Sequence, residues 1–383
     1  MDSNTFPKLF EVHVSDPLSS SFEKLTDTRM KRGIRYHFKP LVILLFLSKL
    51  GGADTPAEIA DWVSFRFSQL KSLLKLDWKR APHEVTWKRF FDQVLRASEL
   101  ETVFGEFLSR LSAAEAELLN LDGKCLCSTI EEQSTRGLHL LALQESEQNL
   151  TVEQTALQAG ENEISAAKRL LKKAVLKNKI VSGDAIFAQQ ELAQTVVTRG
   201  GEYLWKLRAN QGTIYAQARA HFESLTDRYL ARASSLEKGH GRIEEREIVS
   251  SFRLAGSLEF PSLEQIFKIT RRSEQIKSGR QTEQTIYGIT SLPVEKYDAA
   301  ELLKLTRRHW SIENGLHYRR DGTFKEDKVR KKSSNGGQVM AALNNLAIGV
   351  LRKAGWENLA KARRYYGVHI AEGLALILQP IVL

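Results

Sequence analysis

The first part of the chain has apolar residues at helical spacing, and this spacing changes near residue 115. Leu41–Leu50 is strongly apolar, but a membrane span needs about twenty such residues, so we expect a buried core helix here. A second helix start follows, with Thr55 as N-cap, Pro56 at the first helical position and Glu58 completing a capping box. The pattern therefore predicts a helical N-terminal domain over residues 1–112.

A further short helix in this domain is predicted to begin at Thr86 as its cap. We expect Trp87 and Phe90 to pack in the helical core. Lys88 and Arg89 lie between them and are candidates for entering a DNA groove in the manner of a helix-turn-helix protein. Plain helical packing without DNA contact is the alternative for this segment.

After residue 115 the pattern becomes that of an α/β domain, which we place at residues 113–383. Strands are predicted at 118–127, 138–143, 150–157, 179–184 and 203–207, and helices at 163–177 and 189–199. Three strands followed by alternating helix and strand predict a mixed sheet flanked by helices. Strand-like runs near 244–249, 266–271 and 285–290 indicate a strand-rich insertion at about 212–298. One helix is expected from 297 to about 318, and another is expected after Ser334–Gly337, through Ala354.

The composition adds a preference for polyanionic partners. The chain has 383 residues, a formal net charge of +10 and a sequence pI near 9.4. Such a charge favours nucleic acid as a partner, although a basic protein without one is the alternative. At this length the chain can bury a large core and divide into two or three domains.

The two cysteines and the N-terminus indicate a cytoplasmic protein. Cys125 and Cys127 stand two residues apart on a predicted strand, so both face one side and do not pair easily. We expect free thiols in a reducing cytosol, since a metal site needs more ligands than these. Met1–Thr5 has neither a basic start nor an apolar run, so no secretory signal is expected. We expect no membrane association.

Three acidic residues could form a pocket for divalent metals. Asp122 and Asp184 each follow an apolar run that is predicted to be a strand, and Glu313 lies in a helical pattern. Two divalent ions about 3.5–4 Å apart can clamp the attacking and leaving oxygens of a phosphoryl displacement. Magnesium prefers oxygen ligands, and a rigid central strand suits the bridging carboxylate, so Asp122 fits that position. In a chain this basic, a phosphodiester is the expected substrate.

The helix around Glu313 has a polar stripe. Thr306, His309, His317 and Arg320 lie at helical spacing from it. His309 and Arg320 could hold a scissile phosphate while Glu313 holds metal, and a solvated helix face is the alternative. The spacing of His309, Glu313 and His317 also resembles that of a zinc site, but a further ligand at suitable spacing is missing.

Basic residues accompany the proposed pocket. Lys124, Lys206 and Arg208 lie on or beside predicted strand ends, and a polar loop, 210–211, follows. Lysine, arginine and amide side chains all contact DNA phosphates, so these residues are candidate DNA contacts. Between residues 301 and 332 there are ten Lys or Arg against five acidic residues. A basic surface there would give salt-dependent DNA binding, with ordinary surface solvation as the alternative.

Taken in order, short motifs along nearly the whole chain resemble insertion-sequence DDE transposases of the H-repeat-associated kind. The motifs are Arg32-Gly-Ile-Arg-Tyr36, Gly52-Ala-Asp-Thr-Pro-Ala-Glu-Ile-Ala60 with Trp62, Asp122-Gly-Lys124, Glu161-Asn-Glu-Ile164, Gly183-Asp-Ala185, Asn210-Gln211, His240-Gly-Arg-Ile-Glu244, His309-Trp-Ser-Ile-Glu-Asn-Gly-Leu-His317 and Glu326-Asp-Lys-Val-Arg330. Each motif alone is a weak match, whereas all of them in order are specific.

The resemblance implies an RNase H-like catalytic core with Asp122, Asp184 and Glu313 as the metal-binding triad, holding two Mg²⁺ or Mn²⁺ ions. It also implies an insertion between Asp184 and Glu313. This chain departs from the pattern nearby: Thr306 and His309 stand where related enzymes often have tyrosine and arginine, and Arg320 takes the place of a lysine. A further departure lies at position 127, where a cysteine replaces an arginine.

The leading functional hypothesis is therefore a DNA transposase that cleaves transposon ends and transfers the strand into target DNA. Its partners would be double-stranded terminal repeats and target DNA, and the resemblance implies a homodimer in the synaptic complex of a bacterial, nucleoid-associated protein. The alternatives are a DNA-binding transposase remnant without catalysis and an RNase H-like nuclease without strand transfer.

Overall fold

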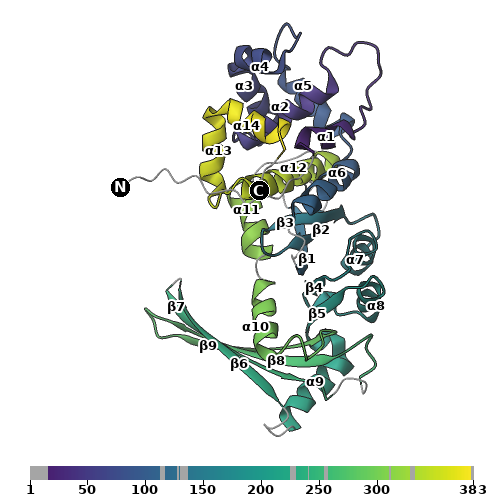
Figure 1. Ribbon diagram of the computed structural model, residues 1–383, viewed down its shortest axis with the longest axis vertical. Coiled ribbons are helices and arrows are strands. Elements are labelled where there is room, and N and C mark those ends of the chain that lie inside the picture. The colour runs from purple at the N-terminus through teal and green to yellow at the C-terminus, as the bar shows by residue number, and fades with distance from the viewer. Residues whose placement is uncertain are drawn as a thin grey trace. The chain divides into compact units, whose positions relative to one another are not determined.

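The computed structural model divides the chain into two compact units (Figure 1). It describes residues 16–112, 117–126, 129, 137–224, 230–239, 241–253, 258–309, 312–327 and 333–380, apart from the side chains at 210, 313 and 314. Unit 1 consists of residues 1–114, 123–157 and 313–383, and unit 2 consists of residues 115–122 and 158–312. Within the described residues, no helix is both long and apolar enough to cross a membrane.

Unit 1 combines the N-terminal helices with the C-terminal helices and a β-hairpin. Its elements are α1 (Leu18–Glu23), α2 (Phe38–Leu50), α3 (Pro56–Phe65), α4 (Phe67–Leu74), α5 (Glu84–Arg89), a π-helical segment (Phe90–Val94), α6 (Ala97–Leu111), β2 (Leu138–Glu145), β3 (Leu150–Ala156), a second π-helical segment (Glu313–His317), α11 (Tyr318–Gly322), α12 (Ser334–Lys353), α13 (Leu359–Val368) and α14 (Ile370–Leu378). The N-terminal helices thus share a unit with later elements, and an independent domain at 1–112 stays a prediction.

The local signals in the N-terminal helices are mostly confirmed. Helix α2 buries every residue from Leu41 to Leu50. The capping box at the start of α3 is present, with Thr55 accepting from the Glu58 amide. Trp87 and Phe90 are buried as expected. The expected cap at Thr86 is wrong: the cap lies three residues earlier, at His83, whose imidazole accepts from the Val85 amide.

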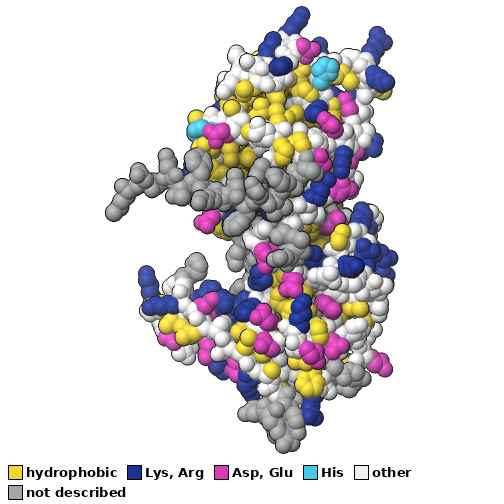
Figure 2. Space-filling model, in the orientation of Figure 1, with side chains coloured by type: hydrophobic (Ala, Val, Ile, Leu, Met, Phe, Trp, Pro, Cys, Tyr) yellow, Lys and Arg dark blue, Asp and Glu magenta, His cyan; other side chains and the backbone are white. Residues whose placement is uncertain are grey.

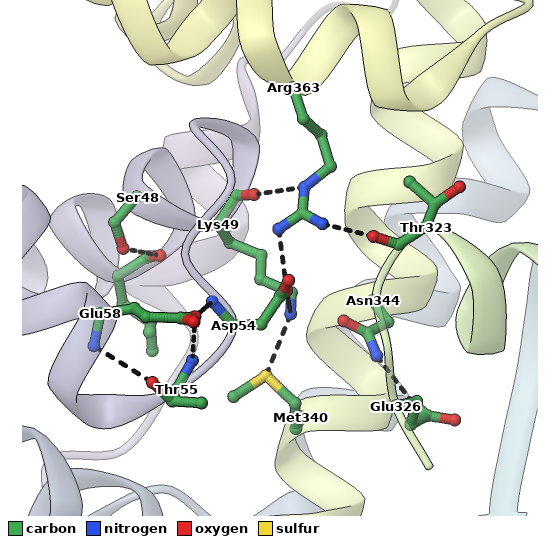
Figure 3. Close-up of polar contacts among 11 residues, drawn as sticks. Ser48, Lys49, Asp54, Thr55, Glu58, Thr323, Glu326, Met340, Asn344 and Arg363 are labelled. Carbon is green, nitrogen blue, oxygen red and sulfur yellow. Dashed lines mark hydrogen bonds and ion pairs between the residues drawn. The ribbon is translucent and has the colours of Figure 1, made fainter. Parts of the chain in front are cut away.

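A buried charged cluster joins the start of unit 1 to its end (Figure 3). The Asp54 carboxylate accepts from Lys49 Nζ at 2.5 Å and from Arg363 Nη2 at 2.8 Å. Arg363 also donates to the carbonyl oxygens of Lys49 and Thr323. The side chains of Lys49, Asp54 and Arg363 are 0%, 9% and 7% exposed. Asp54 therefore offsets part of the positive charge that α2 and α13 bring into the core.

Unit 2 is an α/β arrangement that ends in a long antiparallel part. Its elements are β1 (Leu118–Leu126, shared with unit 1), α7 (Glu163–Leu171), β4 (Ile180–Gly183), a 3₁₀ turn (Ala185–Phe187), α8 (Gln190–Thr198), β5 (Glu202–Leu207), a second 3₁₀ turn (Ala209–Gln211), α9 (Gly212–Ser224), β6 (Ala231–Gly239), β7 (Arg242–Ser251), β8 (Gln265–Gln275), β9 (Gln281–Thr290) and α10 (Ala299–Arg308). All strands and helices predicted between 118 and 207 are present.

The strand order confirms the expected RNase H-like mixed sheet. In unit 1 the neighbours run β3-β2-β1, and in unit 2 they run β1-β4-β5-β9-β8-β7-β6. Strands β1, β4 and β5 are parallel, whereas β3 is antiparallel to β2. An antiparallel hairpin followed by parallel strands, in the order 3-2-1-4-5, is the arrangement of an RNase H-like core.

Strands β6 to β9 form what we call the arm, and it is the expected strand-rich insertion. All its neighbouring strands are antiparallel, and β9 joins it to β5. Helix α10 packs on one face of the arm, and α9 packs on the other through Tyr287. Gly288 lies beneath the ring of Phe267, where a Cβ atom would be 2.0 Å from the ring.

Three parts of this region differ from the sequence prediction. Strand β6 and helix α9 were not predicted, because both have mostly polar, exposed sequences. The expected continuous helix from 297 to about 318 is also wrong. Helix α10 ends at Arg308, and the Glu313–His317 backbone is π-helical, so helical spacing does not hold across this region.

Candidate metal and DNA site

Asp122 and Asp184 lie at equivalent positions on neighbouring parallel strands. The last registered pair of β1 and β4 is Leu121 with Gly183, so the next residues in the register are Asp122 and Asp184. Adjacent strands are about 4.8 Å apart, and side chains at equivalent parallel positions point to the same face. Strand β1 continues to Leu126, so Asp122 lies within the strand, after its apolar run.

The same row continues onto β5 with a cation. Gly183 pairs with Trp205, which places Lys206 beside Asp184. The Lys206 ammonium donates to Asp184 Oδ1 at 2.8 Å. A row of two aspartates and one lysine therefore crosses three parallel strands on one face of the sheet.

On the face that carries this row, the residues nearer the strand starts are apolar and the residues next to the row are polar. Leu118, Ile180 and Leu204 lie on this face and form a buried cluster with leucines of α10. The next positions along the strands are polar and buried: Asn120 and Ser182. Helix α10 thus covers the apolar part of the face and ends beside the acidic row.

His309, the C-cap of α10, connects these buried polar groups to Asp184. Asn120 Nδ2 donates to the Arg308 carbonyl at 3.1 Å, and Ser182 Oγ donates to Asn120 Oδ1 at 2.6 Å. Because the hydroxyl proton is used in this way, Ser182 accepts from His309 Nδ1 at 2.9 Å. This arrangement places a proton on Nδ1 and directs Nε2 toward Asp184 Oδ1, 3.4 Å away.

The electrostatics keep Asp184 ionised. The imidazole of His309 and the ammonium of Lys206 hold the pKa of the Asp184 carboxyl well below its usual range, against the raising effect of burial. Both partners contact Oδ1, and the side chain remains 42% exposed. Among the described residues, Asp184 Oδ2 has no partner, which leaves one ionised oxygen for a further ligand.

Of Glu313, the third residue of the predicted triad, the structure describes the backbone only. Its backbone begins the π-helical segment, which opens the 313–383 part of unit 1. Its side chain lies outside the described residues. Among the described side chains, no three His, Cys, Asp or Glu groups come together in a way that could hold a metal ion. The triad therefore stays a prediction. Cys127 also lies outside the described residues, and Cys125 is an exposed free thiol.

Arg208 is placed well for a role at this site. It is exposed and follows Lys206 by two residues, with extended backbone angles of −134° and 171°. Its side chain therefore continues on the same side as that of Lys206. In unit 1, Lys88 and Arg89 are exposed on α5. DNA contacts by these three residues stay predictions.

Lys124 and Arg320 have acidic partners inside unit 1. Lys124 is buried and contacts Asp321, with Asp327 at 3.6 Å. Arg320 is fully buried and donates to Glu326 Oε2 at 2.7 Å. A phosphate contact by either cation would require these ion pairs to open.

Of the remaining polar stripe, His317 is half-buried in the π-helical segment. Thr306 is buried, and its hydroxyl donates to the Leu303 carbonyl inside α10. The residues that the sequence reasoning missed are Asn120 and Ser182, because two neutral polar residues in strands carry no recognisable signal.

The sheet and the paired aspartates define a protein of the RNase H-like class. Comparison with known families shows to which family within this class the chain belongs. The family model "Transposase DDE domain" matches residues 126–349, and the model of the region associated with that domain matches residues 19–108. The chain therefore belongs to the DDE transposase family. The matched segment contains Asp184 and Glu313, and it begins four residues after Asp122.

Curated bacterial relatives agree with this family. The Escherichia coli O157:H7 protein YncI, provisionally named a transposase, is 25% identical over 86% of this chain and 85% of its own length. YhhI of Escherichia coli K12, provisionally named an H repeat-associated transposase, is 24% identical over 85% and 88%. A solved piggyBac transposase synaptic complex with hairpin DNA matches 95% of this chain and 80% of that chain, with 10% identity and a TM-score of 0.44. The family assignment does not depend on this match.

Proposed function

We propose that this protein is a DNA transposase that cleaves a strand at transposon ends and joins the exposed 3′-hydroxyl to target DNA. Asp122, Asp184 and Glu313 would be its metal-binding triad. The observation that carries the proposal is the register of β1 and β4, which gives two aspartates equivalent positions on one face of a rigid parallel sheet. Family membership supports the same assignment.

The donor set suits magnesium or manganese. Carboxylate oxygens are the ligands that such hard cations prefer. Asp122 lies within a strand, which is a rigid platform for a metal ligand, and Asp184 has an ionised oxygen without a described partner. When bound, two such ions would activate the attacking oxygen and neutralise the charge on the leaving oxygen.

The residues around the aspartates would orient the reacting groups. Lys206 and His309 hold Asp184 Oδ1, which fixes the direction of the free oxygen. Arg208 would contact a phosphate beside the cleaved bond. In cleavage, a water oxygen attacks phosphorus and the strand's 3′-oxygen leaves as a hydroxyl. In joining, that hydroxyl attacks a target phosphodiester, and a target 3′-oxygen leaves, so neither step needs a nucleotide cofactor.

The other basic residues would bind the DNA ends. Lys88 and Arg89 on α5 would contact duplex DNA, and a homodimer would hold two ends in the synaptic complex. Contacts by Lys124, His317 and Arg320 belong to the same proposal, with rearrangement of the acidic partners of Lys124 and Arg320. A nucleoid-associated location in the bacterial cytoplasm would follow from such DNA binding.

The triad is tested with purified protein, Mg²⁺ or Mn²⁺ and DNA carrying the inverted repeats that flank the gene. Asp122→Ala should lower cleavage at least about 100-fold, corresponding to about 3 kcal/mol of lost transition-state stabilisation, while end binding is retained. Glu295→Ala removes an exposed carboxylate elsewhere in unit 2 and should cleave like wild type. Wild-type cleavage by Asp122→Ala would show that the triad assignment is wrong.

The same assay separates the two alternatives. A DNA-binding remnant would bind ends and yield no product with either metal. An RNase H-like nuclease would cut without preference for the repeats and would form no joined product. Detection of strand-transfer product excludes both.

A further inference from the structure

The segment Gly241-Arg-Ile-Glu-Glu-Arg246, which the triad does not use, lies at the start of β7. Successive strand residues alternate between faces, so Arg242, Glu244 and Arg246 share one face of the arm. Arg246 pairs with Arg271 on β8, which brings a third arginine to that face. The order of the motif thus has a direct structural meaning: it alternates cation, carboxylate and cation on one surface.

Glu244 is the centre of this cluster. Its side chain is only 8% exposed, and its carboxylate contacts Arg271, Arg246 Nη2 at 2.9 Å and Arg242 Nε at 3.6 Å. Three guanidinium groups therefore converge on one buried carboxylate.

A fourth arginine extends the cluster toward α10. Arg246 Nη1 also lies 3.2 Å from Glu237 Oε2, and Glu237 pairs with Arg307 of α10. Four arginines thus share two glutamates, which leaves an excess of positive charge on this face. We call these six residues the arginine cluster.

The opposite face of the arm has balanced charge. By the strand register its charged residues are Arg232, Lys238, Lys268, Arg272, Glu245, Glu247, Glu274 and Glu283, four of each sign. Figure 2 shows Lys and Arg side chains at the free end of the arm, interleaved with acidic ones. Counted over the strands alone, the face of the arginine cluster has three arginines against two glutamates, an excess of one positive charge that the opposite face lacks.

The arginine cluster lies on the same sheet face as Asp184. Lys206 pairs with Gly288, and Gly288 pairs with Phe267, so the face continues from β5 into the arm. Arg271 follows Phe267 by four residues, in the direction in which β4 leads to Asp184. With about 3.3 Å per residue and about 4.8 Å between strands, Arg271 is on the order of 20 Å from Asp184. This separation equals the axial rise of about six base pairs of B-form DNA.

We infer that the arginine cluster binds a backbone phosphate of duplex DNA, and that Glu244 holds its guanidinium groups in position. Arginine forks match phosphate oxygens, and an anion would neutralise the excess charge that the two glutamates leave. The position of this phosphate, on the order of 20 Å from the cleaved bond, rests on the proposed function. Phosphate binding itself does not.

Cross-strand ion pairs that only stabilise the arm are the competing explanation. The two explanations differ in the effect of Arg242, whose side chain is 36% exposed and which makes the longest of the three contacts to Glu244. Arg272 on the opposite face is 52% exposed and also pairs with glutamates, so it is a matched control of equal charge.

The test measures binding of the full-length protein to a 40-base-pair duplex of arbitrary sequence, without divalent metal, across a range of salt concentrations. Arg242→Ala should weaken binding about five- to tenfold and reduce the magnitude of the slope of log K against log salt by about one. Arg272→Ala should change neither quantity. Equal effects of the two variants, or no effect of Arg242→Ala at an unchanged melting temperature, would overturn the inference.

Glu244→Gln tests the positioning role separately. This variant adds one net positive charge to the face, so binding should tighten if charge alone matters. If Glu244 sets the geometry of the guanidinium groups, binding should weaken two- to fivefold despite the added charge. Tighter binding would overturn the positioning role.

Failure of the inference can be distinguished from failure of the proposed function. Binding to arbitrary duplex involves no cleavage, so an Arg242 effect can be present even if Asp122→Ala cleaves like wild type. In that outcome the phosphate site stands and the triad is wrong. If Asp122→Ala abolishes cleavage and Arg242→Ala binds normally, the reverse holds.

Discussion

Two aspartates in this protein each lie beside two basic groups, and they differ in what surrounds them. Asp54 in unit 1 receives Lys49 and Arg363 within the core, and all three side chains are less than 10% exposed. Asp184 in unit 2 receives Lys206 and His309, but its own side chain is 42% exposed. The chemistry of the pairs is similar, whereas their access to solvent is not.

This difference separates a structural ion cluster from a candidate functional one. A charge buried with its partners contributes to stability only as long as the set is complete, because removing one partner leaves the others uncompensated. An exposed carboxylate is screened by solvent and contributes little to folding. Asp184 is therefore accessible to a ligand, whereas Asp54 is not.

The largest expected effect is that of Asp54→Ala. It leaves two cations buried without their carboxylate and should lower the free energy of unfolding by about 3–5 kcal/mol. Urea denaturation measures the loss, and hydrogen exchange should locate it in peptides of α2, α3 and α13. A loss below 1 kcal/mol would remove the distinction between the two clusters.

Ser182→Ala should have the next largest effect, because the hydroxyl links Asn120 to His309. Its removal leaves a buried amide oxygen and a buried imidazole N–H without their partner, at a cost of about 1–3 kcal/mol. Urea denaturation measures the change, and exchange should increase in β4 and α10. An unchanged stability would show that this relay does not hold the end of α10.

Lys49→Met should change the free energy of unfolding by about 1 kcal/mol or less, in either direction. Burial lowers the pKa of Lys49, and Asp54 opposes this shift, so the ammonium is costly to hold in the core. Asp54 keeps Arg363 as partner, and the new side chain would lie beside Met340. A loss as large as that of Asp54→Ala, in the same denaturation assay, would contradict the charge-balance argument.

The smallest expected effect is the pH dependence from Asp184. Its pKa is lowered in the folded state, so its stabilising contribution is present above the unfolded pKa of about 3.9 and is lost as pH falls below it. Because the side chain is exposed, this contribution should be about 1 kcal/mol or less. The stability difference between wild type and Asp184→Asn, measured from pH 6 to pH 3, should be constant at first and then shrink. A difference that grows toward pH 3 would contradict the sign.

Local signals made much of the fold predictable. The capping box at Thr55, the apolar helix at Leu41–Leu50 and the strand before Asp184 depend on residues close in sequence, and all three are confirmed. Strand β6 has no apolar alternation, since both of its faces are largely exposed, and it could not be predicted in this way.

The candidate site was predictable only in part, because the sequence of one strand does not determine with which residues of the next strand it pairs. The sequence indicated two strand-associated aspartates, but the pairing of Lys206 with Asp184 follows from the register of β4 and β5. The burial of Arg320 depends on Glu326 and on packing within unit 1. Spacing from Glu313 assumed a continuous helix, which the π-helical segment contradicts.

The register of β1 and β4 also determines which changes in gene length this protein can tolerate. A one-codon insertion between Leu118 and Leu121 would turn Asp122 to the opposite face of the sheet, away from Asp184. A two-codon insertion would restore the face but move the aspartate by about 6.6 Å along the strand. In-frame insertions should therefore be recovered in the turns of the arm, such as around Gly279, and be absent from residues 118–121 and 180–183 in any selection for active protein.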